Sequence, residues 1–234
     1  MEQMEVLLRE GLNALGLPEG AAAPLAHYGE LLLETNQVMN LTAITDPADV
    51  AALHFLDSAA LLTLADFHDK SVADVGTGAG FPGLPLKIVE PSIRLTLLDA
   101  QGKRVRFLES VCRELGLEDV ACIHGRAEEF AADRRESFDL VTSRAVAALP
   151  VLSELCLPLV KPGGYFLAMK SVDCEAELSS AKRALDTLGG RVEAVRDYEI
   201  PGTDVRHRLI LIKKFRQTPE KYPRAFAKIK KNPL

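Results

Sequence analysis

A glycine-rich segment of the sequence has the spacing of a loop that holds a nucleotide-like ligand. It reads VADVGTGAGFPGLP and occupies residues 72–85. Gly78, Gly80 and Gly83 fit G-x-G-x-x-G, the pattern of loops that bind the pyrophosphate of a dinucleotide. Glycine suits such a loop because it permits tight turns and lets backbone N–H groups approach a ligand without a Cβ atom between them.

The same segment also fits D-x-G-x-G, a pattern that suggests S-adenosylmethionine as the ligand. Its members are Asp74, Gly76 and Gly78. Asp74 would repel a pyrophosphate, whereas it could lie near the α-amino group of S-adenosylmethionine. An equally good interpretation makes Asp74 a cap for the N–H groups of its own loop. The spacing of this segment alone therefore leaves both ligands open.

A carboxylate further along the chain could bind a ribose. Asp99 follows the next apolar run, and its oxygens can accept hydrogen bonds from ribose hydroxyl groups. NAD and S-adenosylmethionine both contain an adenosine, so Asp99 does not distinguish them. Residues 125–128 (Gly-Arg-Ala-Glu) follow a third apolar run, where contacts with adenine would fall. A dehydrogenase usually continues into a substrate domain, for which the chain leaves no room, so we favour a methyl donor.

From residue 70 onward, the segments that position these residues alternate between short apolar runs and helical stretches. This alternation predicts a parallel sheet covered by helices on both faces. We therefore expect an α/β, Rossmann-like fold whose sheet is mostly parallel, with a terminal antiparallel strand. The predicted strands cover residues 71–76, 94–100, 120–125, 138–145, 165–171, 192–200 and 206–215.

Apolar residues at helical spacing predict a helical segment before the glycine-rich loop. We expect three parts in one compact unit: a helical N-terminal cap at 1–66, a donor-binding core at 67–216 and a basic C-terminal tail at 217–234. The predicted helices of the cap cover residues 2–16, 21–38 and 48–63.

The two ends of the chain carry opposite charge. Residues 1–66 contain ten acids and one base, whereas residues 206–234 contain ten Lys or Arg and one acid, although the net charge is −5. A basic tail on an acidic body indicates a polyanionic partner, and the alternative is that both ends are simply solvated. Pro219, Pro223 and Pro233 disfavour a regular helix through the tail, so we expect an extended arm.

Composition argues against several other classes of protein. No apolar run approaches membrane-spanning length, and the acidic N-terminus lacks the features of a signal peptide, so we expect a cytoplasmic protein that does not bind membranes. The four widely spaced cysteines form no C-x-x-C, and we interpret them as reduced thiols. The five histidines are scattered, and we expect neither a metal site nor a Ser/His/Asp set.

Several segments together resemble one family. DVGTGAGFPGLPLKI, LLDAQGKRVRFLESV, GRAEEF and FDLVTSRAVAAL occur in the order found in the glucose-inhibited division protein B (RsmG) family, and the C-terminal TPEKYPRAFAKIKKNPL matches as well. The resemblance covers nearly the whole chain. It departs in the tail, where the family often has a Gly/Pro-containing stretch after Tyr-Pro-Arg and this sequence has residues 225–229, Ala-Phe-Ala-Lys-Ile.

The resemblance implies a class I methyltransferase that uses S-adenosylmethionine to methylate N7 of a guanine, guanine 527, in 16S ribosomal RNA. It implies 16S rRNA or the small ribosomal subunit as the partner, and we expect a monomer. The expected donor contacts are Gly76, Phe81, Asp99, Ala100, Gln101, Ala127, Glu128 and Arg144, to which the glycine pattern adds Asp74 and Gly78.

The implied chemistry needs alignment more than proton transfer. Guanine N7 carries a free lone pair, so we expect no general base, and alignment of N7 with the S–CH₃ bond can supply roughly 7–11 kcal/mol of the barrier. Arg144 is our candidate catalytic residue, because it lies near the carboxyl end of the fourth predicted strand and could position the substrate. It could pair with guanine O6, a phosphate or the carboxylate of the donor; the alternative is a structural ion pair.

Two groups of basic residues are candidates for contacts with RNA. The first group opens a predicted helix beside Asp99, where Lys103 and Arg106 share a face, and a merely solvated face is the alternative. The second group belongs to the tail. The candidates are Lys103, Arg104, Arg106, Arg224, Lys228, Lys230 and Lys231.

Two further features have more than one interpretation. His54, Asp57 and Ser58 lie on one predicted helix, and we favour packing of the cap onto the core over a role at the active site. Phe81 could cover the bound donor or belong to the core. An NAD-dependent oxidoreductase, a methyltransferase acting on a non-RNA substrate and a non-catalytic ribosome-binding module remain alternative functions.

Overall fold

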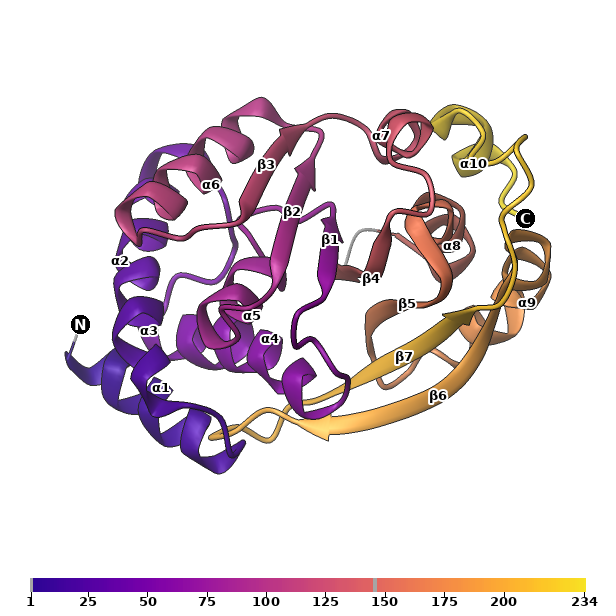
Figure 1. Cartoon of the computed structure of the whole chain (residues 1–234). Coiled ribbons are helices and arrows are strands. Elements are labelled where there is room, and N and C mark those ends of the chain that lie inside the picture. The colour runs from indigo at the N-terminus through magenta and orange to yellow at the C-terminus, as the bar shows by residue number, and fades with distance from the viewer. Residues whose placement is uncertain (1, 145–146) are drawn as a thin grey trace.

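The computed structural model describes residues 2–144 and 147–234, and its centre is a seven-stranded sheet with the order β3-β2-β1-β4-β5-β7-β6 (Figure 1). Strands β1 to β5 are parallel, whereas β7 is antiparallel to both of its neighbours. The predicted mostly parallel α/β sheet is therefore confirmed, and Ala145, the predicted last residue of the fourth strand, lies outside the described residues. The strands are β1 (Ser71–Val75), β2 (Arg94–Asp99), β3 (Val120–His124), β4 (Phe138–Arg144), β5 (Val160–Ser171), β6 (Gly190–Glu199) and β7 (Arg206–Lys214).

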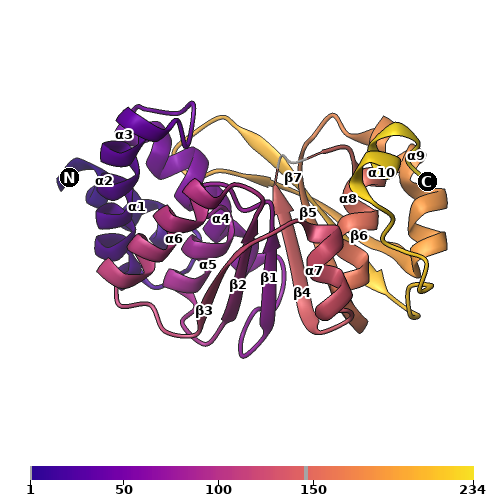
Figure 2. The same ribbon diagram turned by 90° about the horizontal axis from the view of Figure 1, so that it is seen from above.

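Helices cover both sides of the sheet (Figure 2). Helices α1 to α6 lie on one side and α7 to α10 on the other, each group packed over its own buried apolar cluster. In the described part of the chain, no helix is long and apolar enough to cross a membrane. The α-helices are α1 (Glu2–Ala14), α2 (Ala22–Met39), α3 (Pro47–Val50), α4 (Asp57–Ala59), α5 (Gly83–Val89), α6 (Gly102–Glu114), α7 (Ala127–Asp133), α8 (Leu149–Cys156), α9 (Glu175–Leu188) and α10 (Phe226–Lys231).

The strand order reverses between β1 and β4. Asp74 of β1 pairs with Leu97 of β2 on one side and with Thr142 of β4 on the other. Open α/β sheets bind their ligands at the carboxyl ends of the strands where such a reversal occurs. The glycine-rich loop leaves β1 at this end and Arg144 ends β4 at this end, so the topology brings both candidates to one edge of the sheet.

The N-terminal helices pack onto this sheet instead of forming a core of their own. Leu8 and Leu12 of α1 and Tyr28 of α2 are fully buried in the same apolar cluster as Leu97 of β2. The Tyr28 hydroxyl also donates a hydrogen bond to the carbonyl of Ala79, in the glycine-rich loop. The cap is therefore in direct contact with the loop that it precedes.

The predicted helix at 48–63 is present as consecutive helical turns. Asp46 caps its start, because its Oδ1 accepts hydrogen bonds from the backbone N–H groups of Ala48 (2.9 Å) and Asp49 (3.1 Å). A π-helical turn at Ala51–Leu56 interrupts the regular helix. Such turns are frequent at functional sites, and this one contains His54.

The prediction of an extended C-terminal arm is wrong. Between Pro223 and Pro233 the chain forms α10, and Ile229 on this helix is fully buried. The two prolines lie outside the helix and therefore do not interrupt it. A helix this short depends on packing for its stability, and the buried Ile229 side chain provides that packing.

Candidate active site

The glycine-rich loop follows β1 with a backbone that favours glycine. Gly76, Gly78 and Gly80 have φ angles of 69°, 62° and 104°, which side chains other than glycine rarely adopt. A Cβ atom on Gly78 would meet nothing within 4 Å, whereas one on Gly80 would collide with the Tyr28 hydroxyl. A Cβ on Gly83 would lie 2.6 Å from Leu97 Cδ2. The loop is thus open at Gly78 and closely packed at the next two glycines.

The side chain of Asp74 connects the two ends of this loop by hydrogen bonds. Its carboxylate is fully buried, and Oδ2 accepts hydrogen bonds from Thr77 Oγ1 (2.7 Å) and from the backbone N–H of Gly83 (2.9 Å). Burial raises the pKa of Asp74 to about 6, against the lowering effect of these hydrogen bonds. In the structure, Asp74 caps an N–H group of its own loop, as one of the two interpretations requires. A contact between Asp74 and a donor stays a prediction.

A first cavity lies at the carboxyl ends of β1, β2 and β3. Asp99 is one of the residues that line it; its Oδ2 accepts a hydrogen bond from the Gly78 N–H (2.9 Å) and its Oδ1 accepts one from the Gln101 N–H (2.8 Å). The side chain of Gln101 is exposed at the start of α6 and does not line the cavity. The predicted donor contacts that line it are Gly76, Asp99, Ala100, Ala127 and Glu128.

These residues suit an adenosine. A carboxylate can accept about four hydrogen bonds. Three of these on Asp99 come from the N–H groups of Gly78 and Gln101 and from Arg104 Nη1, at 3.5 Å. One acceptor position therefore remains for a ribose hydroxyl. The side chains of Leu98 and Leu155 provide apolar surface beside it. A carboxylate next to apolar side chains suits a ribose that is attached to an aromatic nucleobase.

Arg144 is anchored at the end of β4 by groups from the helical cap. Its Nη1 donates to Asp57 Oδ2 (3.0 Å) and to the Leu53 carbonyl (3.1 Å), and its Nη2 lies 3.0 Å from His54 Nδ1. The guanidinium carbon lies 5.0 Å from the centre of the Phe81 ring. The structural ion pair considered as an alternative is therefore present, and a substrate contact of Arg144 stays a prediction.

Asp57 is the centre of this arrangement. It is fully buried, and its Oδ1 accepts hydrogen bonds from the Tyr198 hydroxyl (2.8 Å) and from His207 Nδ1 (2.8 Å). Burial alone would raise the pKa of Asp57, but the hydrogen bond from His207 and the charge of Arg144 outweigh burial and lower it. Asp57 is therefore an ionised carboxylate that joins β4, β6 and β7 to the cap.

His54 is neutral in this site. Burial and the nearby charge of Arg144 lower its pKa to about 4. Because arginine can only donate, His54 Nδ1 accepts from Arg144, and Nε2–H donates to Thr42 Oγ1 at 2.8 Å. The His54 ring stacks on Phe81, with 4.4 Å between ring centres. Phe81 is itself buried among aromatic rings, as its core interpretation requires.

A second cavity adjoins this network at the carboxyl ends of β4 and β5. It is lined by His54, Asp57, Arg144 and His207 together with apolar side chains such as Met169. The helix that contains His54 and Asp57 packs the cap onto the core, as we favoured. Both residues also line this cavity. The two cavities lie along the same edge of the sheet, at neighbouring parallel strands.

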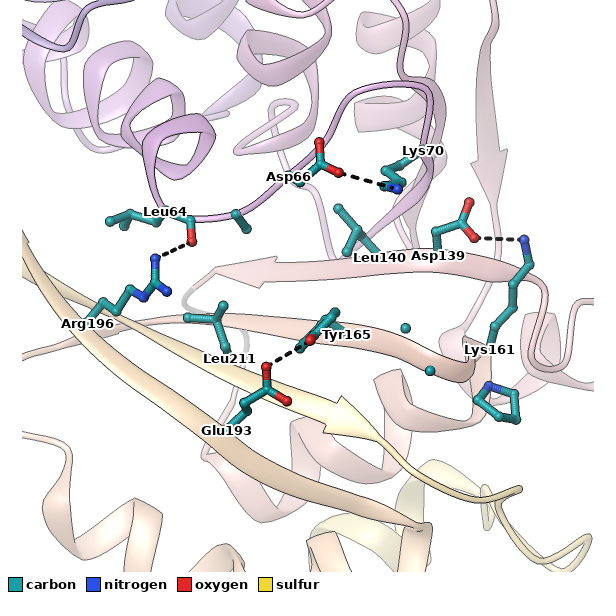
Figure 3. Close-up of a pocket in the computed structure, with 14 residues that line it drawn as sticks. Leu64, Asp66, Lys70, Asp139, Leu140, Lys161, Tyr165, Glu193, Arg196 and Leu211 are labelled. Atoms are coloured by element: carbon teal, nitrogen blue, oxygen red, sulfur yellow. Dashed lines mark hydrogen bonds and ion pairs between the residues drawn. The ribbon is translucent and has the colours of Figure 1, made fainter.

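A further hollow lies at the opposite end of the strands, near the start of β1 and β4 (Figure 3). Its charged groups already have ion-pair or hydrogen-bond partners within the protein. Lys161 pairs with Asp139 (3.0 Å), and Arg196 donates to the Leu64 carbonyl (2.8 Å). We assign no ligand to this hollow, because its charges are satisfied and it is remote from the glycine-rich loop.

The basic residues predicted to bind RNA occupy different environments. Lys103 and Arg106 are exposed on α6, whereas Arg104 is half-buried and turned toward Asp99. Arg224 forms a bidentate pair with the fully buried Glu154, with Nε–Oε1 at 2.8 Å and Nη2–Oε2 at 2.6 Å. The remaining candidates are exposed on α10: Lys228, Lys230 and Lys231.

Several residues of the site were not among the sequence candidates. Tyr198 and His207 bind Asp57 from strands far away in the chain, and Phe226 of α10 lines the first cavity. No local pattern marks Tyr198 or His207, since only the pairing of β6 with β7 brings them together. Phe226 could have been noticed as an aromatic residue in the segment where the tail departs from the family pattern.

Comparison with known proteins identifies the family. A family model described as rRNA small subunit methyltransferase G matches residues 22–207. The Ribosomal RNA small subunit methyltransferase G of Acetivibrio thermocellus is 45% identical over 242 residues and covers 100% of both chains. The protein of the same name from Staphylococcus carnosus is 49% identical over 211 residues, or 88% of each chain.

A solved structure supports the fold. A SAM dependent methyltransferase from Aquifex aeolicus matches with a TM-score of 0.52 and 18% identity, over 74% of this chain and 96% of that one. The full-length sequence similarity and the site at the carboxyl edge of the sheet lead to one assignment. The chain belongs to the rRNA small subunit methyltransferase G family.

Proposed function

We propose that this chain transfers a methyl group from S-adenosylmethionine to N7 of a guanine in the RNA of the small ribosomal subunit. The observation that carries the proposal is the pair of cavities at neighbouring parallel strand ends, one suited to an adenosine and the other bordered by Arg144. The family assignment supports the substrate class and favours a methyl donor over NAD. Guanine 527 of 16S rRNA is the position that the resemblance implies.

The first cavity and the glycine-rich loop would hold the donor. Asp99 would accept from the ribose, and the open backbone at Gly78 would let the donor approach the loop closely. Bound S-adenosylmethionine supplies a methyl group on a positively charged sulfur. The buried Asp74 would act indirectly, by keeping the loop in the shape that exposes its N–H groups.

The second cavity would hold the guanine. Within the described residues, three of the five N–H groups of Arg144 have partners, which leaves two to donate to an acceptor such as guanine O6. Asp57 neutralises the guanidinium, so Arg144 can orient the base without adding net positive charge near the sulfonium. N7 has a free lone pair, so the contribution of these residues is alignment.

Methylation of RNA tests this function directly. The purified protein is incubated with methyl-labelled S-adenosylmethionine and either small ribosomal subunits or free 16S rRNA from cells that lack the activity. We expect label in 7-methylguanosine at a single position, and label in another nucleoside would overturn the proposed acceptor. Using both substrates also shows whether assembly is needed. We place the reaction in the cytoplasm, where small subunits are found.

The donor is tested separately by calorimetric titration. The wild-type protein should bind S-adenosylmethionine and S-adenosylhomocysteine and should not bind NAD. Tight binding of NAD, together with no binding of S-adenosylmethionine, would support the oxidoreductase alternative and contradict our proposal.

A further inference from the structure

The C-terminal tail is fixed to the body of the protein just before α10. The backbone N–H of Arg224 donates to Glu154 Oε1 at 2.9 Å, in addition to the two side-chain hydrogen bonds of this pair. Arg135 donates to the carbonyls of Tyr222 (2.7 Å) and Pro219 (3.1 Å). Figure 1 shows α10 lying beside α7 and α8, next to the carboxyl ends of the strands.

Helix α10 has two different faces. Phe226 and Ile229 are separated by three positions and therefore share one face, which packs against the apolar cluster around α8. Ile229 is fully buried and Phe226 is half-buried. Lys228, Lys230 and Lys231 are exposed.

Phe226 reaches the first cavity and contributes to its wall together with Leu155 and Ala127. Its ring is only half-buried because one part packs on the cluster and the rest borders this cavity. Asp99 and apolar side chains such as Leu98 line the same cavity, and Phe226 is the one aromatic residue of its lining in the described part of the chain. An aromatic wall is a common support for a nucleic acid base.

We propose that Phe226 is a donor-binding residue, which forms the wall against which the adenine of S-adenosylmethionine packs. This inference rests on the proposed function and goes beyond it, because it makes the C-terminal helix part of the donor site. The segment responsible is the one in which this chain departs from the Gly/Pro-containing tail of its family resemblance. Phe226 is far from the glycine-rich loop in the sequence, and the Arg224–Glu154 pair holds the start of α10 against α8, close to the first cavity.

Titration of three variants tests the inference. Phe226→Ala should raise the Kd for S-adenosylmethionine by about tenfold, in line with the loss of one base–aromatic contact. Phe226→Leu should give a smaller increase, because it keeps the apolar packing and loses the aromatic face. Phe215→Ala is the matched control: Phe215 is 51% exposed, does not line the first cavity, and its replacement should leave the Kd unchanged.

Adenosine alone shows which part of the donor Phe226 contacts. If Phe226 contacts adenine, Phe226→Ala should weaken the binding of adenosine and of S-adenosylmethionine by the same factor. Thermal unfolding of each variant checks that the fold is kept, and Phe226→Leu serves if Phe226→Ala is unstable. Wild-type affinity in a folded Phe226 variant would overturn this inference and leave the proposed function standing. Failure of the wild-type protein to bind S-adenosylmethionine would instead contradict the proposed function.

Discussion

Arg144 and Asp57 form an ion pair that joins the end of β4 to the helical cap, with 3.0 Å between Nη1 and Oδ2. Asp57 is fully buried and the Arg144 side chain is 17% exposed. Hydrogen bonds from Tyr198 and His207 hold the other carboxylate oxygen. The cap therefore has a specific task, because it supplies the anion that fixes a cation beside the second cavity.

Replacement of Asp57 by Asn should damage both stability and activity. It leaves the Arg144 guanidinium without its counter-ion in a mostly buried position, and breaking a buried pair in this way costs about 3–5 kcal/mol. Urea unfolding measures the loss. Asp66→Asn is the matched control, since the Asp66 side chain is 71% exposed in its pair with Lys70 and such surface pairs contribute at most about 1 kcal/mol. Equal losses in the two variants would contradict the central role of Asp57.

Replacement of Arg144 tests its part in methyl transfer. Arg144→Ala should lose most activity, and Arg144→Lys should not restore it, because a lysine cannot bind Asp57, Leu53 and His54 in this fork and still offer donors to the base. We expect kcat to fall by roughly 100-fold, the size of effect that a small misplacement produces. Steady-state kinetics with both substrates is the measurement. An unchanged kcat and KM would leave Arg144 with a purely structural role.

His207 should make stability depend on pH. Its hydrogen bond to Asp57 raises the pKa of His207, against the lowering effects of burial and of Arg144. The stabilisation is therefore fully present below the unfolded-state pKa, about 6.5, and is lost as pH rises through the higher folded-state pKa. The difference in unfolding free energy between wild type and His207→Gln should shrink as pH rises from about 6 to about 9. In an Asp57→Asn background, His207→Gln should show no such trend.

The sequence predicted the scaffold better than it predicted the contacts. Mostly apolar runs such as 95–98 are buried in strands, and their alternation with helices was enough to predict the sheet and the positions of Asp99 and Arg144 on it. The Asp57–His207 contact joins residues 150 positions apart, and no periodicity encodes such a pair. Helix α10 differs from the prediction for another reason: prolines disfavour a helix through the whole tail, but they do not prevent a short helix between Pro223 and Pro233, where Phe226 and Ile229 have helical spacing.

Gly78→Ala should remove donor binding with little further effect on the fold. At φ 62° the added Cβ introduces backbone strain of about 1–2 kcal/mol, and it would project into the open space through which we propose that the donor approaches the loop. Gly202→Ala is a matched control, because Gly202 has a φ of 77°, has no atom within 4 Å of an added Cβ, and lies in the turn between β6 and β7. Both variants should lose similar stability. Only Gly78→Ala should lose affinity for S-adenosylmethionine in a titration, and near-normal affinity would contradict the assignment of the loop.

The lysines of α10 should bind RNA without taking part in the chemistry. Lys228, Lys230 and Lys231 are exposed and form no ion pair within the described residues, whereas the guanidinium of Arg224 is held by Glu154. Each lysine that neutralises a phosphate releases counter-ions, so replacing all three by Ala should flatten the plot of log K against log salt by up to roughly two units. The measurement is RNA binding over a series of salt concentrations.

Two controls make the lysine experiment specific. Replacing Arg9, Lys70 and Arg94 by Ala removes the same charge. Lys70 precedes β1 and Arg94 is the first residue of β2, so both lie at the opposite edge of the sheet, and the slope should stay near that of the wild type. Donor affinity of the α10 variant, measured without RNA, should also stay unchanged, because its lysines do not line the first cavity as Phe226 does. An unchanged salt slope in the α10 variant would mean that the tail lysines are only solvated. The exposed Lys103 and Arg106 of α6 would then be the next candidates for the RNA-binding surface.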